Sequence, residues 1–327
     1  MDEFRNLRII FMGTPEFAVA SLNALVDAEC NIVGVITAPD KAAGRGLKTQ
    51  ESPVKKYAVE KGLPVLQPEK LKNPDFLRKL AALEADLQVV VAFRMLPEVV
   101  WSMPRMGTIN VHGSLLPQYR GAAPINWAII NGEKETGITT FKLQHEIDTG
   151  NILLQDRIQI GEHETAGELH DKMKMLGAEL LVKTVKLLAH GTLEEKQQTQ
   201  IAEGRKTELK HAPKIFTETC KINWNKPVAE VYNLIRGLSP YPAAFTELNG
   251  KILKIYKGEK EMQPTSSEPG EIETDQKTYL KFTCIDGAIS VKELQLEGKK
   301  RMTIEDFLRG YKPPSPKGKL DDHSDKT

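Results

Sequence analysis

The stretch Leu7–Ala38, LRIIFMGTPEFAVASLNALVDAECNIVGVITA, determines the fold class. Its opening apolar run predicts a buried strand over 7–13, and the segment 14–28 that follows has the apolar spacing of a helix. A second apolar run predicts a strand over 31–38. A strand, a helix and a strand in this order are typical of a parallel sheet that is covered by helices.

The same alternation continues as far as residue 190. Apolar runs and helical spacings predict further strands over 64–68, 86–93, 108–114 and 136–143, and further helices over 54–62, 74–85 and 165–191. We therefore expect the fold class α/β, with a Rossmann-like, mostly parallel sheet in a domain that spans residues 1–190.

The rest of the chain predicts a different architecture. Residues 191–212 are polar and have no periodicity, which is typical of a linker. Residues 213–312 contain two hairpin signals, Asn249-Gly250 and Asp286-Gly287, and favour a small C-terminal OB-like β-barrel. Residues 313–327 have the composition of a disordered tail.

Composition indicates a globular protein of two domains, with 327 residues, 40% hydrophobic and 27% charged. The sequence has no apolar run of about 18 residues, and its opening lacks the features of a secretion signal. The three cysteines are far apart and form no C-x-x-C pair, which argues against a disulfide framework and a zinc site. We expect a cytoplasmic protein that binds neither a membrane nor a metal ion.

Charge alone does not indicate a nucleic-acid partner, because the net charge is only +1. Basic residues nevertheless gather in two stretches. Residues 40–56 hold five basic and two acidic residues, and residues 299–319 hold seven basic and two acidic residues. Taken alone, a run of this kind is usually only a solvated face.

Three polar residues at the ends of two predicted strands suggest a site. Asn110 and His112 are two positions apart on the strand over 108–114, so they lie on one face, near the edge where open α/β sheets bind ligands. Asp148 follows the next predicted strand. Each feature alone is usually structural, as a satisfied polar pair or an Asx turn. Together they predict a site that combines an amide, an imidazole and a carboxylate.

The glycine-rich stretches exclude two common nucleotide sites. The turn at Gly13–Pro15 has no G-x-G-x-x-G pattern, and AAGRG at residues 42–46 is not followed by the Lys-Ser or Lys-Thr of a phosphate-binding loop. The sequence therefore gives no support to a dinucleotide or nucleoside-triphosphate enzyme.

NVHGSLLPQYRGAAPINWAI (110–129), with DTG at 148–150, resembles the signature of the formyltransferases that use 10-formyltetrahydrofolate. RIIFMGTPEFAVASLNAL, GVITAPDKAAGRG, SPVK and RGLSPYPAAF resemble the branch of this family that acts on methionyl-tRNA. The resemblance covers residues 7–310. It implies transfer of a formyl group from the co-substrate 10-formyltetrahydrofolate to the α-amino group of methionyl-initiator tRNA, for translation initiation.

The resemblance also implies roles for individual residues. Asn110 and His112 would donate hydrogen bonds to the oxyanion of a tetrahedral intermediate, and Asp148 would hold and charge His112. The folate-binding turn would consist of Ser114, Leu115, Leu116 and Pro117. An α-amino group is partly neutral near pH 8, so this chemistry needs neither a covalent enzyme intermediate nor a metal.

The loop KAAGRGLK, residues 41–48, resembles an insertion that contacts the acceptor end of tRNA. Lys41, Arg45 and Lys48 would then bind tRNA, and Arg45 between two glycines is suited to reach a phosphate. The basic C-terminal barrel would add phosphate contacts. We expect the enzyme to be a monomer.

Other functions fit parts of the sequence. A formyltransferase that acts on a nucleotide-sugar amine would share the 110–129 segment but would need neither the AAGRG loop nor a basic barrel. A glycinamide ribonucleotide formyltransferase would end near residue 200. A folate-dependent hydrolase or sensor and a nucleic-acid-binding module without enzymatic activity are the alternatives from other classes.

Overall fold

The computed structural model describes residues 3–43, 48–204, 208–262 and 267–310. The chain divides into two compact units. The first unit comprises Met1–Ile125, Glu135–Ile160 and Glu168–Lys214, and the second unit comprises Asn126–Lys134, Gly161–Gly167 and Ile215–Thr327.

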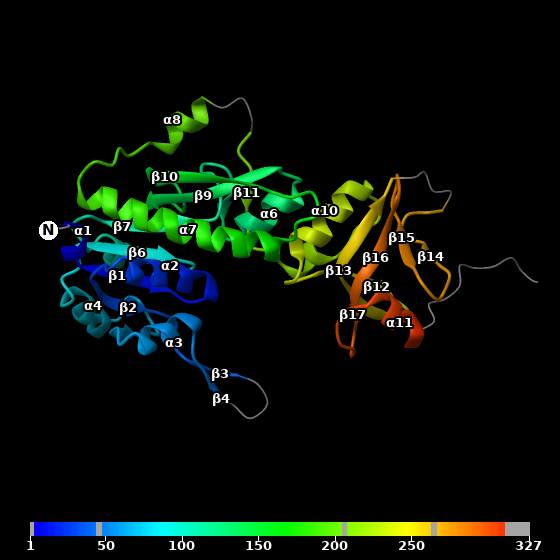
Figure 1. Ribbon diagram of the computed structural model, residues 1–327, viewed down its shortest axis with the longest axis horizontal. Coiled ribbons are helices and arrows are strands. Elements are labelled where there is room, and N and C mark those ends of the chain that lie inside the picture. The colour runs from blue at the N-terminus through cyan, green and yellow to red at the C-terminus, as the bar shows by residue number, and fades with distance from the viewer. Residues whose placement is uncertain (1–2, 44–47, 205–207, 263–266, 311–327) are drawn as a thin grey trace, which may run out of the picture. The chain divides into compact units, whose positions relative to one another are not determined.

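A seven-stranded sheet runs through the first unit (Figure 1). Its strands lie in the order β10-β9-β7-β6-β1-β2-β5. Strands β7, β6, β1, β2 and β5 are parallel, whereas β9 and β10 are antiparallel additions at one edge. The strands are β1 Ile9–Gly13, β2 Ile32–Ile36, β5 Val65–Leu66, β6 Leu87–Val91, β7 Thr108–His112, β9 Glu135–Lys142 and β10 Ile152–Gln159. The predicted α/β class with a mostly parallel sheet is confirmed.

Helices cover this sheet because its strands are apolar on both faces. The longer ones in this part of the chain are α2 Glu16–Asp27, α3 Pro53–Glu60, α4 Pro74–Ala81 and α7 Ala166–Ala189, and the short ones are α1 Glu3–Asn6 and α5 Glu98–Trp101. Phe76 and Leu80 of α4 join Ile10 of β1 in one apolar cluster. A Cβ at Gly177 of α7 would lie 3.3 Å from Val111 of β7, so α7 packs closely on that strand.

The segment 191–212 differs from its prediction as a linker. It contains helix α8 (Gln198–Glu203) and strand β11 (His211–Ala212), and β11 pairs with β8 (Arg120–Gly121). The side chain of Gln198 is only 2% exposed. Hydrogen bonds and a few isolated apolar side chains hold this segment to the first unit, so the sequence shows no regular hydrophobic spacing there. The predicted disordered tail 313–327 lies outside the described residues.

A small hairpin projects from the first unit at the predicted tRNA-binding loop (Figure 1). Its strands are β3 (Lys41–Ala43) and β4 (Lys48–Gln50), which pair antiparallel. Lys41 is exposed. Arg45 lies outside the described residues, and only the backbone of Lys48 is described.

The second unit is built around an antiparallel sheet in the order β12-β13-β16-β15-β14, with β17 added beside β16. Its elements, with helix α6 that leads into it, are α6 Pro124–Ile130, α9 Thr217–Cys220, α10 Val228–Leu238, β12 Ala244–Leu248, β13 Lys251–Glu261, β14 Ile272–Thr274, β15 Leu280–Thr283, β16 Ala288–Leu296, β17 Met302–Thr303 and α11 Ile304–Gly310. The Asn249-Gly250 turn joins β12 to β13, with both residues at positive φ, as that dipeptide predicts. Over the described residues the sheet is a half-barrel, because no ladder joins β14 to β12.

A single apolar core fills the second unit. Residues of α10 such as Val231 and Ile235 pack against buried residues of the sheet such as Phe282 and Leu294. Trp224 stacks on Phe282 with ring centroids 4.6 Å apart and donates a hydrogen bond to the Thr246 hydroxyl.

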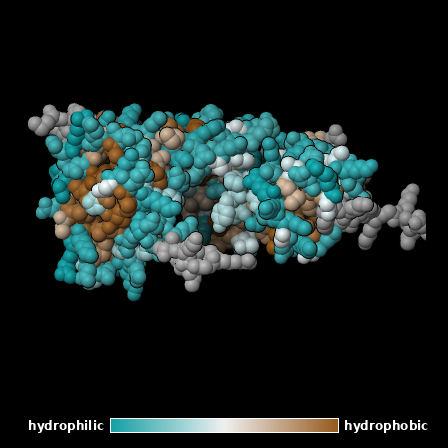
Figure 2. All heavy atoms as spheres, turned by 60° about the horizontal axis from the view of Figure 1, so that its bottom comes forward, coloured by the Kyte–Doolittle hydropathy of each residue, from teal (hydrophilic) through white to brown (hydrophobic). Residues whose placement is uncertain are grey.

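Hydrophilic side chains cover most of the visible face of each unit in Figure 2, and a patch of hydrophobic side chains lies on the first unit. Across the part of the chain that the structure describes, none of the helices is both long and apolar enough to cross a membrane.

Candidate active site

Strand β7 carries two of the predicted site residues to one edge of the sheet. Asn110 lies opposite Val90 of β6 and Phe141 of β9, and His112 ends the strand. Since side chains alternate along a strand, Asn110 and His112 lie on the same face. His112 is buried and Asn110 is half-buried.

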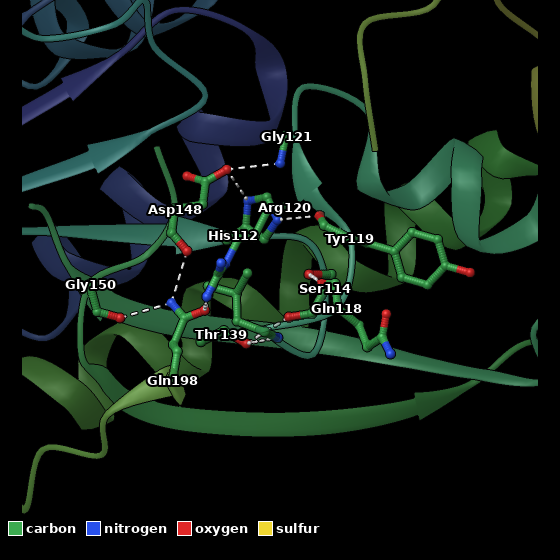
Figure 3. A network of polar contacts seen from close by, with 11 residues as sticks. His112, Ser114, Gln118, Tyr119, Arg120, Gly121, Thr139, Asp148, Gly150 and Gln198 are labelled. Atoms are coloured by element: carbon green, nitrogen blue, oxygen red, sulfur yellow. Dashed lines mark hydrogen bonds and ion pairs between the residues drawn. The ribbon is translucent and has the colours of Figure 1, made fainter. Parts of the chain in front are cut away.

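Both ring nitrogens of His112 face fixed groups (Figure 3). Nε2 lies 2.9 Å from the carbonyl oxygen of Tyr119, so Nε2 carries a hydrogen and donates it. Nδ1 lies 3.8 Å from Oδ2 of Asp148, an ion-pair distance that is longer than a hydrogen bond. The ring also meets Phe141 edge to face, with centroids 6.3 Å apart. Nε2 is therefore committed to a backbone carbonyl, and Nδ1 is the ring nitrogen that faces Asp148.

Asp148 is held in an unusual backbone conformation. It lies in the loop between β9 and β10 with φ of 55°, in the left-handed region. Its Oδ2 accepts a hydrogen bond of 2.9 Å from the backbone N–H of Gly121. Gly150 allows the loop to turn back onto β9, because a Cβ there would lie 1.6 Å from the carbonyl oxygen of Lys142. The Asp-Thr-Gly sequence is therefore needed for both the turn and the carboxylate.

The amide of Asn110 makes no side-chain hydrogen bond to any residue that the structure describes. Its nitrogen and oxygen are not among the buried atoms that lack a partner, so the amide is open to water or to a ligand. Its position on the face of His112 makes it available to a substrate atom. The structure thus brings His112 and Asp148 together and places Asn110 on the same strand face.

Two polar residues that the sequence analysis gave no role support Asp148. Gln198 of α8 donates to the carbonyl oxygens of Asp148 and Gly150, each at 2.8 Å. Arg120 donates to Oε1 of Gln198 from Nε at 3.0 Å and from Nη2 at 2.6 Å. Burial lowers the pKa of the Arg120 guanidinium, while the negative charges of Asp148 and Glu146 oppose that shift. Arg120 lies within the 110–129 segment that carries the resemblance, but nothing local distinguishes Gln198.

The predicted folate-binding turn is tightly built into the first unit. Ser114 Oγ donates to the Gln118 carbonyl at 2.6 Å, so it forms no nucleophilic pair with His112. The side chain of Leu116 is fully buried, and its backbone N–H donates to the Thr139 hydroxyl at 3.1 Å. Pro117 is also buried, whereas Leu115 is half-buried. Of these side chains, Leu115 is therefore the one most open to a ligand.

The chemistry of this arrangement is stabilisation of negative charge and transfer of protons. It offers an amide donor, an imidazole and a carboxylate beside one strand end. Among the described residues, no group of three His, Cys, Asp or Glu side chains is arranged to hold a metal ion.

Comparison with known proteins agrees with the fold. Residues 7–185 match the family model described as formyl transferase, and residues 214–312 match the formyl transferase C-terminal domain. The chain therefore belongs to the formyl transferase family. Relatives from Bacteroides thetaiotaomicron and Parabacteroides distasonis are 54% and 56% identical over 312 and 313 residues, and each alignment covers 94% of this chain and 96% of the relative. Both relatives are named methionyl-tRNA formyltransferase, which confirms the resemblance seen in the sequence.

Solved structures show the same fold at lower identity. The sugar 3N-formyl transferase WlaRD, solved with dTDP and 5-N-formyl-THF, superposes with a TM-score of 0.65 at 21% identity and covers 90% of this chain and 99% of its own. HypX from Aquifex aeolicus, in complex with tetrahydrofolic acid, gives a TM-score of 0.63 at 17% identity, over 94% of this chain and 48% of its own. At these identities the likeness concerns the fold alone.

Proposed function

We propose that this chain transfers the formyl group of 10-formyltetrahydrofolate to the α-amino group of methionyl-initiator tRNA. The product is N-formylmethionyl-tRNA for translation initiation, a reaction that belongs in the cytoplasm. The observation that carries the proposal is the identity of 54–56% with methionyl-tRNA formyltransferases over nearly the whole of both chains. The pair of His112 and Asp148, with Asn110 on the adjoining strand face, supplies matching chemistry.

The attacking group needs little activation. An α-amino group titrates near pH 8, and an ester on the same carbon lowers that further, so a useful fraction is neutral at neutral pH. The amine nitrogen forms a bond with the formyl carbon, and the bond from that carbon to N10 of the folate then breaks. The amine loses one proton, and N10 gains one.

The oxyanion of the tetrahedral intermediate is the charge that the site must stabilise. Asn110 can donate its amide hydrogen, which has no partner in the described residues. His112 keeps Nε2 on the Tyr119 carbonyl, so Nδ1 is the nitrogen left for the oxyanion. At 3.8 Å from Asp148, a hydrogen on Nδ1 is not committed to the carboxylate.

Asp148 is also placed to take up the proton that the amine loses. Its Oδ2 is occupied by the N–H of Gly121. Its other carboxylate oxygen accepts no hydrogen bond from the described residues, and it can accept the proton directly or through a water molecule.

The co-substrate is proposed to be 10-formyltetrahydrofolate, with Ser114, Leu115, Leu116 and Pro117 forming the turn beside it. Leu115 offers an apolar surface, and the backbone of the turn offers hydrogen bonds to a pterin edge. The buried side chains of Ser114 and Leu116 would act by fixing the turn rather than by touching the folate.

The tRNA is proposed to contact Lys41, Arg45 and Lys48 in the hairpin loop, together with the second unit. Contacts of this kind are to phosphates, and each one releases counterions from the nucleic acid. Binding should therefore weaken steeply as salt is added. The logarithm of the binding constant falls linearly with the logarithm of the salt concentration. Alanine at Lys41 and Lys48 should make this slope less steep by about one for each phosphate that the variant no longer binds.

The test is an assay with labelled 10-formyltetrahydrofolate and two acceptors, charged initiator tRNA and an amino-sugar nucleotide. We expect label in the tRNA. Asn110→Asp, which keeps the shape but removes the amide donor, should lower kcat about 100- to 1,000-fold. The exposed Asn6, changed to Asp, is the matched control and should keep the wild-type rate. Formylation of the sugar nucleotide alone, or full activity of the Asn110 variant, would overturn the proposal.

A further inference from the structure

Gln198 lies in the segment 191–212, whose sequence is typical of a linker, yet it is one of the most buried polar residues of the chain. All the hydrogen-bonding capacity of its side-chain amide is used inside the first unit. Both N–H groups donate to carbonyl oxygens of the Asp148 loop, and the oxygen accepts twice from Arg120. A buried amide that is fully satisfied in this way is strongly held in one orientation.

These contacts form a closed ring around Asp148 (Figure 3). From the backbone carbonyl of Asp148 the ring runs to Gln198, from there to Arg120, and along the chain to Gly121. The N–H of Gly121 then returns to the carboxylate of the same Asp148 at 2.9 Å. The ring therefore fixes the backbone of Asp148 from one side and its carboxylate from the other.

Asp148 needs such support, because its φ of 55° is a conformation that residues with side chains seldom adopt. The two carbonyl groups that Gln198 binds flank the turn from Asp148 to Gly150, and they belong to the residues that set its direction. Without these hydrogen bonds, the carboxylate would lose its fixed place opposite Nδ1 of His112.

Helix α8 is itself anchored independently of Gln198. Ile152 and Lys196 exchange two backbone hydrogen bonds, of 2.8 and 2.9 Å, immediately before the helix. Ile201 of α8 packs against the apolar cluster that contains Phe141, the residue in edge contact with His112. Gln198 therefore reaches Asp148 from a helix that is packed on the first unit and fixed there by other contacts.

We propose that Gln198 is a positioning residue for Asp148, with Arg120 as the partner that orients its amide. The inference rests on the proposed function only in taking Asp148 as part of the reacting site. The segment that joins the two family domains would then hold part of the active site in place, in addition to connecting them.

The test compares Gln198→Met, which keeps the length of the side chain but removes its polar atoms, with Gln200→Met as the matched control. Gln200 lies in the same helix and is exposed. We expect Q198M to lower kcat about 10- to 100-fold, because small displacements of a catalytic group have effects of that size. The KM values for the folate and for the tRNA should change by less than about twofold, and Q200M should match the wild type. A raised KM with kcat unchanged, or a wild-type kcat, would overturn the inference.

A double-mutant cycle separates positioning of Asp148 from a general structural role. In single-turnover reactions with enzyme in excess, adding Q198M to Asp148→Asn should slow the reaction by less than about twofold, because the group that Gln198 positions is already altered. A further loss as large as that in the wild-type background would contradict the inference. If Q198M does not fold, Gln198→Glu replaces it, since it keeps the acceptor for Arg120 but loses the donors. Q198E should also lose kcat, and a wild-type kcat for Q198E would overturn the inference.

The cycle is run with whichever amine acceptor the wild-type chain formylates. A wild-type enzyme that is inactive on methionyl-tRNA would refute the proposed function, whereas an active wild type with an equally active Q198M would refute only the role of Gln198.

Discussion

Replacing Gly121 with alanine should damage stability and catalysis together. Gly121 pairs with the linker strand β11, and its N–H donates to the carboxylate of Asp148. Its φ is +126°, outside the small left-handed region open to residues with side chains. A Cβ on Gly121 would lie 2.4 Å from the carbonyl oxygen and 2.9 Å from the carbonyl carbon of Ala212. Both atoms belong to the backbone, so the strand pairing has to open to make room.

The size of the effect follows from two costs. Forcing alanine into an unfavourable φ costs about 1–3 kcal/mol, and overpacking against backbone costs about another 1–3 kcal/mol. Together they amount to about 2–6 kcal/mol, which lowers the melting temperature of a unit of this size by roughly 5–20 °C. Movement of the Gly121 N–H by about 1 Å should also reduce kcat about 10- to 100-fold, through Asp148.

Gly191 provides the control, because it also has positive φ, at +62°, but a Cβ there would meet nothing within 4 Å. Gly191→Ala should therefore lose only about 1–2 kcal/mol and keep its kcat. Calorimetric melting and the formyl-transfer assay on both variants measure the two effects. A G121A protein that melts at a higher temperature than G191A, or that keeps the wild-type kcat, would refute this account of the β8–β11 contact.

Two further predictions concern titratable groups. Burial raises the pKa of Cys30 to about 11 and that of Cys284 to about 12. At pH 8 the native protein should therefore react with a thiol reagent far more slowly than the unfolded protein, in which all three thiols should react. Rapid reaction of the native protein would contradict this prediction. Burial tends to raise the pKa of Glu195, but hydrogen bonds from Lys142 and Asn151 outweigh it and leave the pKa lowered. Its stabilising contribution is then complete above the unfolded pKa near 4.5 and is lost as the pH falls from there through the lower pKa of the folded state. Chemical denaturation should therefore show a shallower acid loss of stability for Glu195→Gln than for the wild type, and identical slopes would argue against the pairing.

Much of the first unit follows from local patterns. The apolar run over 86–93 predicts β6, and the helical spacing over 165–191 predicts α7, each to within a few residues. Strand β10 was not predicted, because its outer half is exposed and its sequence from Gln155 to Gln159 is largely polar. An edge strand of this kind is stabilised by its ladder with β9 rather than by burial on both faces.

The site, too, contains residues that local patterns predict and residues that they do not. Asn110 and His112 could be recognised because two positions on one strand must share a face. Asp148 could be recognised because it follows the next predicted strand and belongs to the DTG of the family resemblance. Gln198 could not be recognised in this way. It reaches Asp148 from 50 residues further along the chain. A single polar side chain that exchanges water for protein partners produces no repeating pattern in the sequence by which it could be recognised.

The segment 191–212 therefore has to be judged by its hydrogen bonds. The carbonyl oxygen of Lys210 accepts from the N–H of Tyr119 at 2.7 Å, and Tyr119 in turn holds Nε2 of His112 through its own carbonyl. Gln198 fixes the backbone of Asp148 from the other end of the same segment. Both members of the imidazole–carboxylate pair are thus supported by residues that look dispensable in the sequence. Because each support acts through a backbone group, changes in this segment should affect turnover through the geometry of the pair, even where no substituted side chain approaches the substrate.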